Sequence, residues 1–200
     1  MPRAKSEAST LVRVPKIDIQ HMTLRLIGDS PLICHAWSEK AKRQMLEKQQ
    51  GAARAAKERK DPHNDFMQSL YPIGDGKYGF PAVAFKSAAV DACTHVEGLT
   101  KVAARGSFHI DAEMVEITGS EPTMREDMVR IGMGTADIRY RGQFYPWSAL
   151  LLIRFNAGAL TGSQIAQLFD TAGFGVGVGE WRPQRDGSFG MFHVAREGDA

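Results

Sequence analysis

The chain of 200 residues is long enough for one domain with a substantial hydrophobic core. Hydrophobic residues make up 43% of it and charged residues 24%, which are ordinary proportions for a soluble globular protein. The formal net charge of +2 excludes a strongly basic molecule, so any attraction to a polyanion has to come from local patches.

The cysteines and the N-terminus give the expected compartment. Cys34 and Cys93 lie far apart and match no metal or disulfide spacing, which favours a reducing compartment and therefore the cytoplasm. We expect no membrane span, because no eighteen apolar residues run together. Residues 1 to 15 are small, polar and mildly basic, which predicts a disordered arm before a single domain over residues 16 to 197.

The first part of this domain is predicted to be a strand followed by a basic insertion. Apolar residues alternate between residues 17 and 26, and Gly28 begins the turn that ends this strand. Residues 38 to 66 form the insertion, a helix with Ser38 as its N-cap. Between residues 40 and 60, eight Lys or Arg stand against two Glu. Both a solvated, partly disordered helix and a functional basic arm fit that composition.

A tight turn and a helix are predicted next. Asp75 and Gly76 in "YPIGDGKYGF" suit a two-residue hairpin. "PAVAFKSAAVDACTHV" indicates a helix with Pro81 in its first turn. Its predicted buried stripe consists of Val83, Ala89, Val90 and Cys93.

The second half predicts strand, excursion, strand, helix and strand. The first strand covers residues 108 to 117, and the segment 120 to 146 reads as an extended, irregular, hairpin-like excursion. "WSALLLIRFNA" has the length of a buried strand. The helix that follows begins at Thr161 or Ser163 and is closed by Gly173. The last strand covers residues 189 to 194.

Without the insertions, the order is strand, helix, strand, strand, helix, strand. This order predicts an α+β fold, a modified ferredoxin-like (βαββαβ) antiparallel sheet with helices on one face. The other face of such a sheet is free to bind a ligand. The order alone does not identify a function, because unrelated functions share this fold.

Four strings resemble the RAMP superfamily of CRISPR effector proteins, especially the backbone subunits that polymerise along a guide RNA. The strings are "LRLIGDSPLICH", "GFPAVAFKSAAVDAC", "MREDMVRIGMGTADIRYRGQFYPW" and the glycine-rich "FGVGVGEWRPQRDGSFGMF". They occur in family order between about residues 20 and 194. The resemblance implies a ferredoxin-like RNA-binding fold, neighbouring copies along one strand and contacts with effector-complex proteins. A stand-alone or phage-encoded relative fits equally well.

The glycine-rich string is the main candidate for nucleic-acid binding. Successive backbone N–H groups in such a loop can bind an anion, and glycines let the backbone approach a ligand closely. Arg182 and Arg185 would contact phosphates, and Trp181 would stack on a base. Alternatively, these glycines only accommodate tight turns, with Trp181 buried.

Other basic residues extend the candidate surface. Arg139 and Arg141 alternate on one predicted strand and would form a short cationic track, although neighbouring acids also predict salt bridges there. Lys86 is either a phosphate contact or a solvent-facing lysine. The complete set of candidate nucleic-acid-binding residues is Lys40, Lys42, Arg43, Lys86, Arg125, Arg130, Arg139, Arg141, Trp181, Arg182 and Arg185.

Catalytic signals are weak. The six histidines show no metal-binding spacing, so we expect no cofactor and no metal site. "DPHND", with Asp61, His63 and Asp65, is the one cluster able to hold a divalent ion, although turn chemistry explains it too. Phe144, Tyr145 and Trp147 are aromatic residues of the core or of a subunit contact, with base stacking as the alternative.

The leading hypothesis is a non-catalytic protein that binds single-stranded RNA or DNA through backbone charge and stacking and oligomerises along the strand. The excursion at residues 120 to 146 would then touch the neighbouring copy. The alternatives are a structural or assembly protein, of phage origin, that ignores nucleic acid, and a metal-dependent nuclease using Asp61, His63 and Asp65.

Overall fold

The computed structural model describes residues 16–51, 59–132 and 134–199, so the arm expected at residues 1 to 15 lies outside the described residues. The protein is a mixed α+β protein with an antiparallel sheet, which confirms the expected class. The larger sheet has the order β10-β1-β9-β6-β4-β3, and β5 also pairs with β9. Its strands are β1 (Ile19–Gly28), β3 (Pro72–Gly74), β4 (Lys77–Pro81), β5 (Phe108–Ile110), β6 (Met114–Gly119), β9 (Trp147–Asn156) and β10 (Phe192–Val194).

Strand β9 lies at the centre of this sheet and shows why one face is covered. Its odd-numbered side chains, from Trp147 to Phe155, are buried, whereas Leu150, Leu152 and Arg154 are exposed. The register of β9 with β1 places Leu151 opposite Leu24, which is also buried. Because alternate side chains of a strand point to opposite faces, one face of the sheet forms the core and the other is bare.

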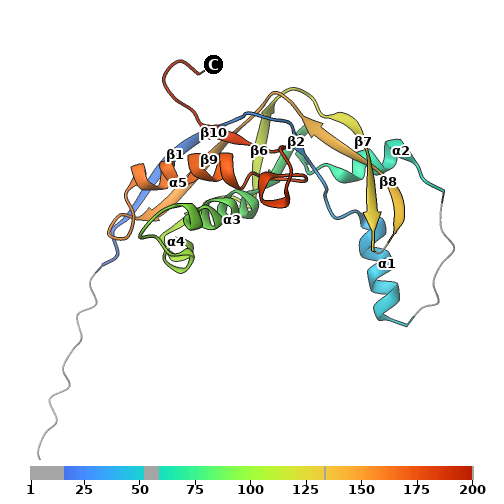
Figure 1. Ribbon diagram of the computed structural model, residues 1–200, viewed down its shortest axis with the longest axis horizontal. Helices are drawn as coiled ribbons and strands as arrows, with labels where there is room; N and C mark the ends of the chain where they lie inside the picture. The colour runs from blue at the N-terminus through green and yellow to red at the C-terminus, as the bar shows by residue number, and fades with distance from the viewer. Residues whose placement is uncertain (1–15, 52–58, 133, 200) are drawn as a thin grey trace, which may run out of the picture.

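The core face is covered by helices α3 (Ala82–Ala92), α4 (Lys101–Ser107) and α5 (Gly162–Gly175), which lie together on one side of the sheet (Figure 1). The predicted N-terminus of α5 is confirmed, since Thr161 and Gln164 form a reciprocal capping box. Gly173 does not end this helix, which continues to Gly175. A Cβ on Gly173 would lie 1.7 Å from the Phe192 carbonyl oxygen, so this glycine permits close packing of α5 on β10.

The excursion at residues 120 to 146 is a regular hairpin. Strands β7 (Thr123–Ile131) and β8 (Thr135–Phe144) pair along their length, and β2 (Leu32–Ile33) pairs with β8 as the third strand of a second sheet. Helix α2 (Pro62–Ser69) packs against β8, where Leu70 and Phe66 lie over Gly142. The hairpin therefore has one face on α2 and the other face toward the glycine-rich loop.

Helix α1 (Glu39–Gln49) belongs to the predicted basic insertion and begins at Ser38, whose side chain accepts a hydrogen bond from Ala41 N. None of its residues is buried. With α2 and the β7–β8 hairpin, α1 lies at the end of the molecule away from α5 (Figure 1). The part of the insertion at residues 52 to 58 lies outside the described residues.

Three expectations about the elements are wrong in detail. Val83 is 68% exposed, whereas the other residues of the predicted stripe, Ala89, Val90 and Cys93, are buried. The strand expected over residues 108 to 117 is divided into β5 and β6, since β5 pairs near the end of β9 and β6 pairs near its beginning. The last strand begins at Phe192, because the residues before it belong to the glycine-rich loop.

The turn at Asp75 and Gly76 is confirmed. Gly74 pairs with Lys77, so two residues connect β3 and β4, and both have positive φ, at 51° and 71°. This geometry is that of the tight hairpin turn which Asp-Gly favours. Elsewhere, no helix in the described ranges combines the length and the apolar composition needed to cross a membrane.

Candidate nucleic-acid interface

The glycine-rich loop connects α5 to β10 over residues 176 to 191 and includes the 3-10 turn η2 (Pro183–Arg185). Gly190 has a φ of 63°, and a Cβ there would lie 1.7 Å from the Val178 carbonyl oxygen. The Val178 N–H donates to the Gly190 carbonyl at 2.9 Å, so the two segments are in backbone contact. This glycine therefore serves the packing of the loop on itself, as the alternative interpretation of the glycines expected.

Trp181, however, is not buried as that alternative expected. Its side chain remains 39% exposed, and its φ of 56° is unusual for a bulky residue. The Trp181 carbonyl accepts from Phe189 N at 3.0 Å, which joins the two sides of the turn. The indole is consequently available at the surface of a well-connected loop.

A cavity of about 220 Å³ lies between this loop and one face of α3. Helix α3 contributes Ala84, Ser87, Ala88 and Asp91, which recur at the spacing of one helical face. The loop contributes Gly177, Gly179, Glu180, Arg182 and Gln184. Ile33, His35, Tyr71 and Phe80 complete the wall from segments that are remote in the sequence.

Arg182 and Gln184 fix the loop to α3. The Arg182 guanidinium donates to the Gly179 carbonyl at 3.0 Å and to Gln184 Oε1 at 3.1 Å. Gln184 in turn donates to Asp91 at 2.7 Å, and Lys101 pairs with the same carboxylate at 2.6 Å. The hydrogen bond from Lys101 is the main reason that the pKa of Asp91 lies below its usual range. Asp91 is therefore an ionised acceptor on the wall of the cavity.

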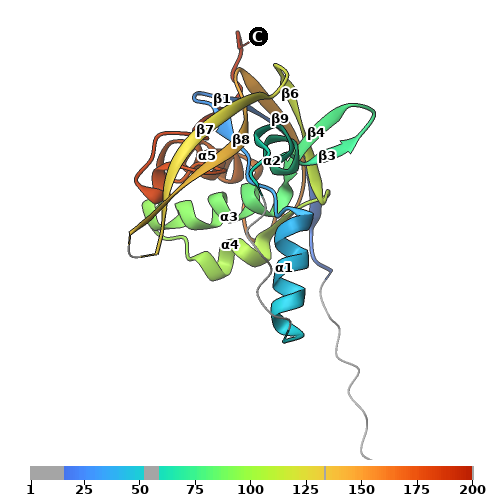
Figure 2. The ribbon, with the colours of Figure 1, turned by 90° about the vertical axis from the view of Figure 1, so that its right-hand side faces the viewer.

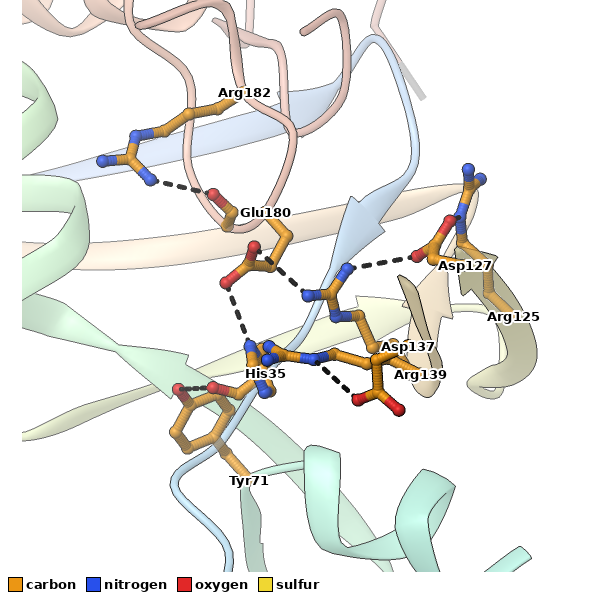
Figure 3. A network of polar contacts seen from close by, with 10 residues as sticks. His35, Tyr71, Arg125, Asp127, Asp137, Arg139, Glu180 and Arg182 are labelled. Atoms are coloured by element: carbon orange, nitrogen blue, oxygen red, sulfur yellow. Dashed lines mark hydrogen bonds and ion pairs between the residues drawn. The ribbon is translucent and has the colours of Figure 1, made fainter. Parts of the chain in front are cut away.

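Glu180 connects the loop to β8 and to His35. Its carboxylate lies 3.2 Å from His35 Nδ1 and 3.6 Å from the guanidinium of Arg141 (Figure 3). The hydrogen bond with His35 chiefly lowers the pKa of Glu180, with burial acting in the opposite direction. The Tyr71 hydroxyl donates to the His35 carbonyl at 3.4 Å, which ties this segment to the start of β3.

Arg141 is not part of an exposed cationic track. It is 3% exposed and pairs with Asp127 at 3.3 Å, and its Nε has no hydrogen-bond partner among the described residues. Arg125 pairs with the same Asp127 at 2.7 Å, and its guanidinium lies 4.6 Å from the centre of the Phe189 ring (Figure 3). Arg139 lies nearer the solvent, 3.9 Å from Asp137. The salt bridges expected from the neighbouring acids are thus present.

Arg185 and Arg130 differ from these arginines. Both are exposed, and neither has an ion pair within the described ranges. Arg185 lies in η2, next to the residues that wall the cavity, whereas Arg130 lies near the tip of the β7–β8 hairpin. Arg185 is therefore the arginine of the loop whose charge is directed to solvent.

The remaining candidates lie apart from the loop. Lys40, Lys42 and Arg43 are on α1, where Lys42 pairs with Glu39 and lies 5.9 Å from the centre of the Trp37 ring. Lys86 is on α3, its ammonium 3.2 Å from His109 Nδ1 and 5.8 Å from the centre of the Phe108 ring. Burial lowers the pKa of Lys86. The structure thus gathers Arg125, Arg139, Arg141, Trp181, Arg182 and Arg185 around the loop and leaves Lys40, Lys42, Arg43, Lys86 and Arg130 in separate places.

Phe144 and Trp147 among the aromatic candidates, and Asp61 of the "DPHND" cluster, have structural roles. Phe144 and Trp147 are buried in the core, and Tyr145 is exposed. Asp61 is the N-cap of α2, where its Oδ1 accepts from Asn64 N at 3.0 Å. Among residues 16–51, 59–132 and 134–199, no three His, Cys, Asp or Glu side chains are arranged to hold a metal ion.

Sequence reasoning missed the cavity itself. His35, Ser87, Asp91, Glu180 and Gln184 come from three distant segments, so no local motif contains them. The small side chains at Ala84, Ser87 and Ala88 were the one available signal, since a helix face without bulky residues leaves space above it. Comparisons of the chain with protein-family models and with curated proteins find no match.

Proposed function

We propose that this protein is a non-catalytic binder of single-stranded nucleic acid that assembles along the strand, with the glycine-rich loop as its main contact. The strand order β10-β1-β9-β6, with α3 and α5 as the connecting helices, supports a modified ferredoxin-like fold for this role. The similarity of four sequence strings to the RAMP superfamily supports the same proposal.

The observation that carries the proposal is the surface of the loop. Trp181 and Arg185 are exposed, and the network of Arg182, Gln184 and Asp91 holds the backbone between them. An exposed aromatic ring and an exposed cation on the same fixed loop match the stacking and phosphate contacts that bind single strands without sequence readout. Arg182 itself positions the loop, because its Nε and both of its Nη atoms donate to the Gly179 carbonyl or to Gln184.

Exposed apolar side chains support the assembly half of the proposal. Met124, Met128 and Ile138 are exposed on one face of the β7–β8 hairpin, and Leu150 and Leu152 are exposed on the bare face of the sheet. Exposed apolar groups on extended strands favour contacts between proteins. The same observation favours the second candidate function, an assembly protein that oligomerises without nucleic acid.

Charge reversal of Arg185 tests the loop contact. Arg185→Glu should weaken binding to a fluorescent single-stranded oligonucleotide about tenfold at low salt and reduce the salt dependence of the affinity, because one phosphate contact is lost. Fluorescence anisotropy at several salt concentrations measures both. The structure predicts unchanged stability, since this side chain has no ion pair within the described ranges.

Lys77→Glu is the matched control. Lys77 is also exposed, and its replacement by Glu changes the net charge by the same amount as Arg185→Glu. It lies on the β3–β4 hairpin, on the opposite side of the molecule from the loop (Figure 2). Equal losses in the two variants would indicate a general charge effect. Unchanged affinity in folded Arg185→Glu would contradict the role of the loop.

A further inference from the structure

The cavity beneath the loop has the chemistry of a site for a small, flat, largely neutral ligand. Its floor is apolar, with Ile33, Phe80 and Val176 all buried. Its volume of about 220 Å³ lies below the ~300–1,000 Å³ typical of sites for drug-sized molecules. A single ring system with its polar edge at the rim would fit such a space.

The polar rim carries charges of both signs. Asp91 pairs with Lys101, and Glu180 pairs with His35 and Arg141. Arg182 also lines the cavity, and its guanidinium donates to two neutral acceptors of the loop, the Gly179 carbonyl and Gln184. A phosphate in the cavity would therefore meet two ionised carboxylates beside the Arg182 guanidinium, so the two negative charges disfavour an anion there. A neutral group that donates hydrogen bonds meets no such repulsion, because carboxylates only accept.

We propose that this cavity receives one unstacked nucleobase of the bound strand and prefers a base with an exocyclic amino group. The inference rests on the proposed function and adds a local base preference to it. Carboxylate oxygens of Asp91 and Glu180 accept from the amino group, as acidic side chains do from cytosine N4. Uracil and thymine present a carbonyl where cytosine has its amino group, and a carbonyl facing these oxygens is repelled by them and forms no hydrogen bond.

A bulky residue at the rim tests whether a base enters. Ser87 is an exposed rim residue of α3, and Val83 is exposed on the same helix but does not line the cavity. The probe is a single-stranded oligouridylate with one central 2-aminopurine, whose fluorescence rises when the base leaves the stack. The wild type and Val83→Trp should give this rise on binding. Ser87→Trp should lose the rise and keep its affinity within about threefold, since the loop contacts remain.

The two pyrimidines test the preference, because cytosine and uracil share one ring and differ in the amino group. The wild type should bind oligocytidylate about five- to tenfold more tightly than oligouridylate. This ratio is what the hydrogen bonds from one cytosine amino group to the two carboxylates would contribute. Ser87→Trp should bind both equally. Equal binding by the wild type would overturn the preference.

The outcomes separate this inference from the function on which it rests. Binding without a fluorescence rise, or a rise that persists in folded Ser87→Trp, would overturn the base site and leave the strand-binding function standing. Absence of binding to any of these oligonucleotides by the wild type would overturn both.

Discussion

At the scale of single residues, the glycine-rich loop depends on positions that only glycine can occupy. Gly190→Ala should destabilise the protein by about 2–4 kcal/mol, because a strained φ adds to a Cβ placed 1.7 Å from the Val178 carbonyl oxygen. Urea denaturation measures the change in the free energy of unfolding. Nucleic-acid binding should fall in the same variant, since Trp181 and Arg185 depend on this backbone.

Gly76→Ala provides the control for strain alone. Gly76 has a φ of 71°, but an added Cβ would have no neighbour within 4 Å. Gly76→Ala should lower the free energy of unfolding by about 1 kcal/mol. If Gly190→Ala cost no more than Gly76→Ala, the close approach of Val178 and Gly190 would not be a constraint on the loop.

At the scale of elements, the β7–β8 hairpin is attached to the loop by buried charges. Asp127→Asn removes the carboxylate that pairs with Arg141 and Arg125, and leaves the buried Arg141 with Glu180 at 3.6 Å. We expect a loss of about 2–4 kcal/mol in the free energy of unfolding, because removing one partner of a buried pair leaves the other uncompensated. Denaturant unfolding followed by circular dichroism measures it.

The matched surface variant is Glu116→Gln, which removes a carboxylate paired with exposed Lys77. A pair of this kind contributes about 0–1 kcal/mol. Similar losses in both variants would mean that the Asp127 network adds nothing to the attachment of the hairpin.

Local signals explain which elements were predictable. Helix α5 has its capping box and its apolar residues in one window, so its N-terminus was confirmed. Strand β7 carries the exposed Met124 and Met128 on one face and a buried, salt-bridged Asp127 on the other. The alternation of buried apolar and exposed polar residues that usually indicates a strand is therefore absent at these positions. The cavity depends on Glu180 N donating to the Ile33 carbonyl at 3.1 Å, a contact across 147 residues that no local pattern indicates.

At the scale of the whole molecule, the candidate basic side chains are divided among the loop, helices α1 and α3, and the β7–β8 hairpin. The net charge of +2 means that copies of the chain repel one another weakly, although each copy offers a cation to a strand. The exposed apolar residues of the hairpin and the sheet, together with this placement of the basic side chains, would allow neighbouring copies to contact one another while each copy binds the same nucleic acid. Assembly should therefore depend on the strand and weaken with salt.

Light scattering after size-exclusion chromatography, with single-stranded oligonucleotides of increasing length, tests this account most directly. Absorbance at two wavelengths gives the protein and nucleic-acid content of each peak. We expect complexes whose protein mass rises by one protomer at a time as the oligonucleotide lengthens, and which dissociate after nuclease treatment. A protein mass that stays the same with every oligonucleotide, in peaks without nucleic acid, would contradict it.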